Sequence, residues 1–467
     1  MVTNRARLAS VDIPVFGIPD REPELPPALF QDRLSQASVR AHGAGLDYLV
    51  VYGDREHFAN LMYLTGHDPR FEEALLVVST GDRGPVLIVG NEGMTYSELM
   101  PIKLERRLYQ GFSLPGQDRS ESPQLERVLP ACGIRRGSRV GLVGWKYATE
   151  LESADPARWL DVPAFIADAL RQLVGDASLV RNAAALFMDP VDGLRSVNDV
   201  HQLAVFEFAA VYSSQAVRAA IEFMRPGMNE FEAVRSMGLN GMPLTAHPNL
   251  SSGPRSRFAL PSPSSRTIQR GDPFFVGLGL RGALTARAGF VVEGASELPT
   301  ESADYLERLV EPYFASAVAW YERLGLGVEA GELHRVVAEV LGPHGLGLAL
   351  NAGHLIHLEE WVHSPVFAGS KAPLRSGMLI QCDLIPIADA RLHTTNIEDT
   401  VALADLELRN ELARSYPAAW QRIQARRDFM IRTLGIELRP EVLPFSNLPA
   451  VLQPFSLNPG LVMVAQA

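Results

Sequence analysis

The sequence predicts two domains, an α/β domain followed by an α+β domain that carries the functional site. The chain has 467 residues, more than one typical hydrophobic core accommodates. Residues 46–174 alternate short β-rich runs with helical patterns, which is typical of an α/β domain with a mixed sheet. From residue 198 onward, pairs of helical patterns separate two sets of strand-like runs. We therefore expect domains at 1–185 and 186–405, followed by a carboxyl-terminal helix and a Pro-rich tail at 406–467.

The amino-terminal domain is expected to begin with an irregular arm, because residues 1–30 are rich in proline. Short runs of β-branched and aliphatic residues then predict strands, and helical patterns lie between them. The segment 175–193, which contains Asp189 and Pro190, is the expected join to the second domain. The predicted strands are 48–52, 74–78, 85–89 and 139–143, and the predicted helices include 57–64 and 163–173.

The second domain is expected to open with a long amphipathic helix that Pro226-Gly227 ends. Asn229 then begins another helix, and Glu232 three residues later completes a capping-box pattern. The tail after the last helix is apolar and contains several prolines, so we expect it to dock on the body of the protein or on a partner. The predicted helices are 198–224, 300–324, 329–341 and 406–435, and strand-like pieces lie at 273–279 and 288–293.

Composition excludes several classes of function. The formal net charge is −11 and no basic run occurs, which argues against nucleic-acid binding. No stretch has the uninterrupted apolar length of a membrane span, and the first ten residues lack the apolar core of a signal peptide. The two cysteines, Cys132 and Cys382, are far apart and match neither a disulfide framework nor a zinc spacing. A reduced, cytoplasmic location is the expectation.

The candidate site lies between residues 352 and 399. His354 follows a glycine, Asp383 ends the apolar run G-M-L-I-Q-C-D, and Glu398 lies within N-I-E-D-T-V. Acids inside strand patterns are costly to bury unless they meet a cation, a hydrogen-bond network or a substrate. A histidine and two acids that converge from neighbouring strands form a plausible metal or acid–base site. The alternative is an ordinary turn histidine with two half-exposed strand acids.

These motifs resemble a known family. G-H at 353–354, the run 377–383 and I-E-D-T-V at 397–401 resemble the last three metal-ligand motifs of the pita-bread family. That family includes methionine aminopeptidase, prolidase, aminopeptidase P and creatinase. The stretch 63–78 resembles the amino-terminal domain that creatinase, prolidase and aminopeptidase P share. The resemblance covers residues 45–405 and implies a creatinase-like α/β domain followed by an α+β pita-bread domain.

The resemblance assigns the metal-ligand positions to His354, Asp383 and Glu398, with Asp383 in place of the usual glutamate. Members that bind two metals need two further aspartates on a preceding hairpin, here 271–291. Between Asp272 and Glu293 this hairpin contains no acid, and Gly277 and about Leu284 occupy the aspartate positions. Two carboxylates balance one divalent cation, and an uncompensated buried charge costs several kcal/mol. We therefore expect a degenerate site with no metal or one divalent metal ion.

Four more residues are candidates for substrate binding by position. In the family, the region of Arg70 overhangs the catalytic site, often that of the partner subunit, so Arg70 is a candidate clamp for a substrate carboxylate. The same resemblance implies a homodimer. His247 is placed near an inner strand, although Pro248 after it also fits a histidine at a strand end. His357 and His363 flank the place of another family histidine and are candidates to replace it.

The leading function is a metal-free or single-metal hydrolase that cleaves a C–N bond of a small carboxylate-bearing compound, as creatinase does. The substrate would be a small molecule or a short peptide. A second hypothesis is a non-catalytic relative that binds a peptide or protein partner. A third hypothesis is an Xaa-Pro aminopeptidase or dipeptidase.

Overall fold

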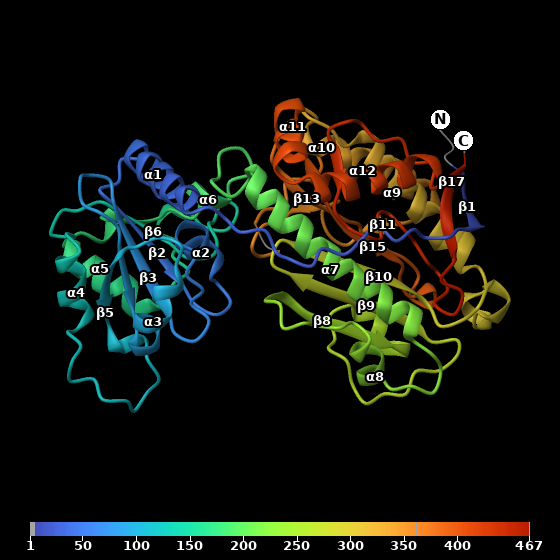
Figure 1. Cartoon of the computed structure of the whole chain (residues 1–467), viewed down its shortest axis with the longest axis horizontal. Coiled ribbons are helices and arrows are strands. Elements are labelled where there is room, and N and C mark those ends of the chain that lie inside the picture. The colour runs from blue at the N-terminus through green and yellow to red at the C-terminus, as the bar shows by residue number, and fades with distance from the viewer. Residues whose placement is uncertain (1–4, 361, 467) are drawn as a thin grey trace. The chain divides into compact units, whose positions relative to one another are not determined.

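The computed structural model describes residues 5–360 and 362–466 and divides the chain into two compact units (Figure 1). The amino-terminal unit is Leu25–Arg195, and the carboxyl-terminal unit combines the segment before Leu25 with the chain from Ser196 onward. The boundary lies later than the predicted end of the first domain at residue 185. Backbone hydrogen bonds explain the difference, since Leu194 and Arg195 donate to the carbonyls of Leu186 and Phe187.

The amino-terminal unit contains a six-stranded mixed sheet with the strand order β5-β4-β3-β2-β6-β7. The pairs β2–β6, β4–β5 and β6–β7 are parallel, and β2–β3 and β3–β4 are antiparallel. The four predicted strands are confirmed as β2, β3, β4 and β6. Two further strands, β5 and β7, were not predicted. The strands are β2 (Tyr48–Gly53), β3 (Ala74–Ser79), β4 (Val86–Val89), β5 (Glu105–Leu108), β6 (Val140–Val143) and β7 (Val180–Asn182).

Helices bury the apolar sides of this sheet. Leu170 and Ile166 of α5 belong to one hydrophobic cluster with Leu129 of α4 and with Val50 and Leu142 of the central strands. The cluster explains why short aliphatic runs form strands here, since each buried apolar side chain contributes roughly 1.5–3 kcal/mol. The helices are α1 (Pro27–Gly43), α2 (Ala59–Thr65), α3 (Asn91–Tyr96), α4 (Leu125–Ala131), α5 (Ala164–Val174) and α6 (Ala185–Met188).

The carboxyl-terminal unit is built on a seven-stranded sheet in the order β12-β13-β15-β10-β9-β8, with β16 also paired to β15. All of these pairs are antiparallel. A two-stranded sheet of β11 and β14 and another of β1 and β17 complete the unit. The strands of the large sheet are β8 (Leu244–Ser252), β9 (Pro273–Leu280), β10 (Ala283–Phe290), β12 (His354–Leu355), β13 (Leu379–Asp383), β15 (Asn396–Leu403) and β16 (Val442–Pro444).

Two pairs of helices flank this sheet, as predicted. Ser213 of α7 donates a hydrogen bond to the carbonyl of Leu278 on β9, and Tyr313 of α9 contacts the backbone of Ile397 on β15. The predicted capping box is confirmed at the start of α8, where Asn229 and Glu232 each accept from the other's backbone N–H. The helices are α7 (Val200–Phe223), α8 (Glu230–Arg235), α9 (Glu311–Arg323) and α10 (Ala330–Leu341).

The second strand of the hairpin before the site begins earlier than predicted. Its second strand is β10, Ala283–Phe290, and not residues 288–293. Only Arg281 and Gly282 separate β9 from β10, and Gly282 has φ +93°. A Cβ there would overlap the ring of Phe206, so both the turn and the packing of α7 require glycine.

The first and the last described strands of the chain belong to this unit. β1 (Arg5–Ser10) pairs antiparallel with β17 (Leu461–Gln466), and the two strands lie side by side in Figure 1. The prediction that the tail docks on the body is therefore confirmed. The single helix predicted at 406–435 is instead two helices, α11 (Leu406–Ser415) and α12 (Pro417–Arg432). Pro417 is the reason, because proline lacks the N–H that a continuous helix needs and suits a first turn.

Candidate functional site

The predicted trio lies on three adjacent strands of the large sheet. His354 begins β12, Asp383 ends β13 and Glu398 lies in β15. Asp383 and Glu398 are directly opposite each other in antiparallel register, so their side chains share one face. His354 is opposite Gln381, two residues before Asp383, and side chains two residues apart also share a face. The sheet therefore brings the three side chains together.

The imidazole lies between the two carboxylates. His354 Nε2 is 4.0 Å from Asp383 Oδ2 and 3.8 Å from Glu398 Oε1. These distances allow charge attraction but exceed those of a hydrogen bond. Asp383 Oδ1 and Glu398 Oε1 are buried and accept no hydrogen bond from the residues that the structure describes. Buried polar atoms in native proteins are almost always paired, so the two oxygens indicate a place that a cation or a substrate fills.

A fourth group, Glu360, reaches the site from a loop. After β12 the backbone turns back on itself, and the N–H of Leu355 donates to the carbonyl of His363 at 2.7 Å. The returning loop places one carboxylate oxygen of Glu360 so that it, one nitrogen of His354 and one oxygen of Glu398 all lie within 4.8 Å of one another. The sequence analysis assigned no role to Glu360, because no strand pattern predicts where this loop returns.

Burial and mutual repulsion set the charge state of the site. Burial raises the pKa of Glu398 well above its ordinary value, and the nearby Asp383 raises it further. Burial likewise raises the pKa values of Asp383 and Glu360. Burial lowers the pKa of His354, but Glu398, Asp383 and Glu360 outweigh it and bring the value to about 9. At neutral pH, with no other cation bound, a protonated His354 is therefore the positive charge among three acids.

The hairpin strands contribute no acid to this face. One line of paired residues crosses five strands, from β8 through β9, β10 and β15 to β13, and every pair in it shares a face. Gly277 and Ala286 are the hairpin's members of this line, and Leu284 lies two residues from Ala286 on the same face. The line consists of Asn249, Gly277, Ala286, Glu398 and Asp383.

The four predicted substrate-binding residues lie in different surroundings. Arg70 belongs to the amino-terminal unit, where it is partly exposed and forms an ion pair with Asp68 at 3.3 Å. His247 is exposed on β8, at the edge of the sheet opposite to β12, and contacts the carbonyl of Leu260 at 3.2 Å.

His357 and His363 follow His354 in the loop. His357 is fully buried and packs edge-to-face on the ring of Phe206 in α7, with 5.0 Å between the ring centroids. This contact gives His357 a packing role. His363 is half-buried, and its carbonyl accepts the hydrogen bond that returns the loop to Leu355. His363 thus helps to fix the loop through its backbone carbonyl.

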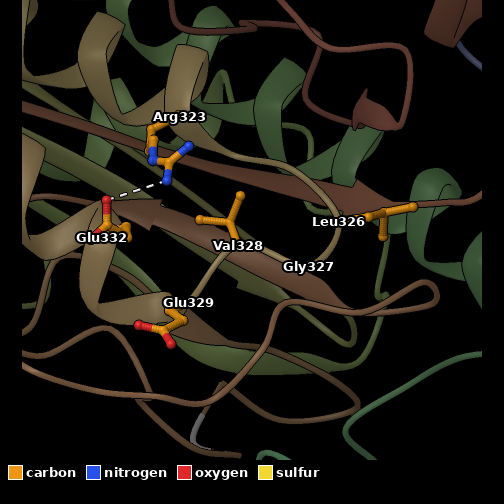
Figure 2. A pocket seen from close by; sticks show the side chains of 6 residues that line it. All are labelled: Arg323, Leu326, Gly327, Val328, Glu329 and Glu332. Atoms are coloured by element: carbon orange, nitrogen blue, oxygen red, sulfur yellow. Dashed lines mark hydrogen bonds and ion pairs between the residues drawn. The ribbon is translucent and has the colours of Figure 1, made fainter.

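A surface pocket of about 500 Å³ lies at the start of α10 (Figure 2). Its charged groups are paired. Arg323 donates to Glu332 at 3.2 Å, and Lys371 donates to Glu329 at 2.8 Å. The pocket contains none of the predicted site residues and is therefore distinct from the centre around His354. Its lining residues are Arg323, Leu326, Gly327, Val328, Glu329 and Glu332.

Comparison with solved structures defines the fold. The chain is similar to a prolidase from Pyrococcus horikoshii OT3, with a TM-score of 0.60 and 17% identity over 80% of this chain and 95% of that one. A dipeptidase PepE from Mycobacterium ulcerans gives 0.58 and 20% identity over 83% and 95%. An X-Pro aminopeptidase from Thermotoga maritima MSB8 gives 0.59 and 16% identity over 80% and 95%. No curated protein is significantly similar to the chain.

The family follows from the sequence of the second unit. Residues 205–405 match the sequence model of metallopeptidase family M24, and this range contains the hairpin and the whole cluster around His354. These residues form a pita-bread domain of metallopeptidase family M24, a family of hydrolases. Both the predicted family and the predicted fold, an α/β domain followed by a pita-bread domain, are confirmed. No helix within residues 5–360 and 362–466 is long and apolar enough to cross a membrane.

Proposed function

We propose that this M24 protein hydrolyses a C–N bond of a small carboxylate-bearing compound or short peptide at the His354 centre, with at most one metal ion. The observation that supports this proposal is the pair of buried oxygens on Asp383 and Glu398 that lie beside an imidazole and accept no hydrogen bond from the described residues. Buried polar atoms in native proteins are usually satisfied by protein, water or a bound group.

His354, Asp383 and Glu398 have complementary parts in such a reaction. In the metal-free centre, the protonated His354 is a proton donor for the leaving nitrogen, because its raised pKa keeps the proton on the ring at neutral pH. Asp383 or Glu398, when ionised, accepts a proton from the attacking water. Their raised pKa values make them stronger bases than an exposed carboxylate.

The donor set also fits one divalent ion. Imidazole nitrogen with carboxylate oxygens suits transition metals, and the unpaired oxygens of Asp383 and Glu398 offer places for it. A bound ion supplies Lewis acidity toward a carbonyl and a water. The three carboxylates Glu360, Asp383 and Glu398 supply three negative charges, fewer than the four positive charges of two divalent ions. The charge of the three acids therefore supports a single ion, as the two strand acids alone do.

Xaa-Pro dipeptides are a second class of substrate, favoured by the structural likeness to a prolidase and to an X-Pro aminopeptidase. A panel of Xaa-Pro dipeptides and of amidino and ureido acids, incubated with metal-free and Mn²⁺-supplemented protein, tests both classes. We expect release of an amine from at least one member, and loss of that release in Glu398→Gln. A protein that binds panel members without hydrolysing any would favour the non-catalytic alternative. Two equivalents of metal retained after desalting would contradict the single-ion site.

We also propose a cytoplasmic homodimer in which Arg70 of one subunit approaches the other subunit's site. Both cysteines are free and buried, which suits a reducing compartment. Arg70 is partly exposed and its ion pair with Asp68 is long, so its guanidinium is accessible to a carboxylate. Light scattering should give twice the mass of one chain, and Arg70→Ala should raise KM more than it lowers kcat. A monomer at micromolar concentration would contradict the proposal.

A further inference from the structure

We propose that Glu360 is a ligand of one divalent transition-metal ion that His354 and Glu398 also bind. The inference rests on the proposed hydrolytic site and names a ligand outside the set that the three strand motifs supply. The sheet then contributes two ligands, and the loop after β12 contributes the third.

The three ligand atoms are near one another but must move closer to hold a common ion. They lie within 4.8 Å of one another. Ligand atoms bound at about 2.0–2.2 Å in tetrahedral geometry are about 3.3–3.6 Å apart. The ligand atoms therefore have to approach one another by up to about 1.5 Å. Glu360 is suited to make this movement, because its loop carries it, whereas antiparallel pairing fixes His354 and Glu398 in the sheet.

A second observation points to a cation at this place. Asp383 Oδ1 and Glu398 Oε1 are buried without a hydrogen bond from the described residues, and both side chains are only 9% exposed. Leaving such atoms unpaired costs about 1–3 kcal/mol each, and more when they are charged. A divalent ion removes this cost for Glu398 directly. Asp383, with Oδ2 4.0 Å from His354 Nε2, remains beside the ion as a further ligand or as a base.

The hairpin leaves a ligand position that a loop acid can fill. In the line of residues that crosses the sheet, Gly277 and Ala286 occupy the hairpin positions next to Glu398 and offer no side-chain oxygen. Glu398 and Asp383 already balance the charge of one divalent ion, so Glu360 acts as a ligand and not as a balancing charge. Glu360 adds a carboxylate oxygen from the loop after β12. It thus supplies, from a different element, part of what the hairpin lacks.

The experiment is a titration of chelator-treated, full-length protein with Mn²⁺ alone and with Zn²⁺ alone, followed by calorimetry. We expect one equivalent per chain. Glu360→Gln should weaken binding at least about tenfold, because even changes outside the ligand shell weaken metal sites about 10–100-fold. The matched control is Glu359→Gln, the adjacent loop acid, which should bind within about twofold of the wild type.

Folding is checked separately, since Glu359 is itself buried. Thermal unfolding of each metal-free variant shows whether it is native, and Glu339→Gln on the exposed side of α10 is the second control. Saturating Mn²⁺ should raise the melting temperature of the wild type and of both controls more than that of Glu360→Gln. Equal affinity in Glu360→Gln and the wild type, or a stoichiometry of zero or two, would overturn the inference.

The titration uses no substrate, so the two proposals fail separately. If the protein binds one ion through Glu360 but hydrolyses no panel member, the metal-ligand proposal holds and the hydrolase proposal fails. If the protein hydrolyses a substrate but Glu360→Gln binds Mn²⁺ and Zn²⁺ as well as the wild type does, the hydrolase proposal holds and the metal-ligand proposal fails.

Discussion

Two neighbouring acids of β15 have opposite surroundings. Asp399 is on the face of the sheet opposite to Glu398, where Arg287 Nη2 donates to both of its oxygens at 3.0 and 2.8 Å. The backbone N–H of Ala450 donates to Oδ2 at 3.0 Å. Arg287 and Asp399 are each only 1% exposed. Glu398 is almost as buried, but its nearest partner is His354 at 3.8 Å and its Oε1 has no hydrogen bond within the described residues.

Arg287 makes the difference between the two faces. Its Nε donates to the carbonyl of Val451, and its terminal nitrogens also donate to the carbonyls of Ala286, Glu398 and Leu448. The hairpin, β15 and the carboxyl-terminal tail are thereby joined through one guanidinium. Burial alone therefore does not mark a functional acid. The mark is a buried carboxylate oxygen that accepts no hydrogen bond from the described residues, which holds for Glu398 and not for Asp399.

The largest effect on stability is expected for Asp399, on the face of the sheet where the acid is hydrogen-bonded to Arg287. Asp399→Asn removes the charge that compensates Arg287, and breaking a buried ion pair from one side costs about 3–5 kcal/mol. Denaturant unfolding of the metal-free protein measures this loss as a lower midpoint. A loss below about 1 kcal/mol would mean that Asp399 is not the structural acid of the pair.

A smaller effect is expected in how folding stability depends on pH, because His354 and Glu398 lie on the other face. The pKa of His354 rises from its ordinary 6.5 to about 9, so protonated His354 stabilises the fold fully below about pH 6.5, and this stabilisation disappears as the pH rises through 9. Burial raises the pKa of Glu398 as well. The folded state therefore holds its proton longer than the unfolded state, and stability again falls as the pH rises.

Melting temperatures in the presence of a chelator test this sign. The melting temperature of the wild type should exceed that of His354→Gln most strongly below pH 6.5. This difference in melting temperature should shrink steadily toward pH 9. Asp399→Asn, measured in parallel, should melt below the wild type by an amount that changes little between pH 6.5 and pH 9. A margin between the wild type and His354→Gln that grows with pH would contradict the assigned charge states.

Strand patterns together with the family resemblance predicted the sheet part of the site. The strand patterns indicated that His354, Asp383 and Glu398 lie on neighbouring strands, and the resemblance assigned their roles. The resemblance also placed Gly277 at the hairpin position beside the acids. Periodicity is local, however, and it does not report which loop folds back over a sheet. Glu360 therefore remained without a role.

The other differences have similar causes. β5 and β7 are short and contain arginines or asparagine, so pairing with neighbours, and not their own pattern, makes them strands. The start of β10 depends on the two-residue turn at Gly282, which the packing of Phe206 selects. The break at Pro417 was present in the sequence, but the helical pattern on both sides of it concealed the boundary.

The smallest change in stability is expected for Glu398→Gln, and this variant tests the central claim most directly. If the cluster is held for binding and catalysis, neutralising Glu398 removes repulsion with Asp383 and a desolvation cost. The free energy of unfolding of the metal-free protein at pH 7 should then be unchanged or raised by up to about 1 kcal/mol, as at other functional sites. Turnover should be lost. The exposed acid in Glu339→Gln is the control and should change neither quantity.

Denaturant unfolding of Glu398→Gln beside the wild type is thus the decisive measurement. The account predicts a midpoint equal to or above that of the wild type, in contrast to the strong loss in Asp399→Asn. A lower midpoint, with a loss of about 1 kcal/mol or more as for a structural hydrogen bond, would show that both acids of β15 serve the fold alone.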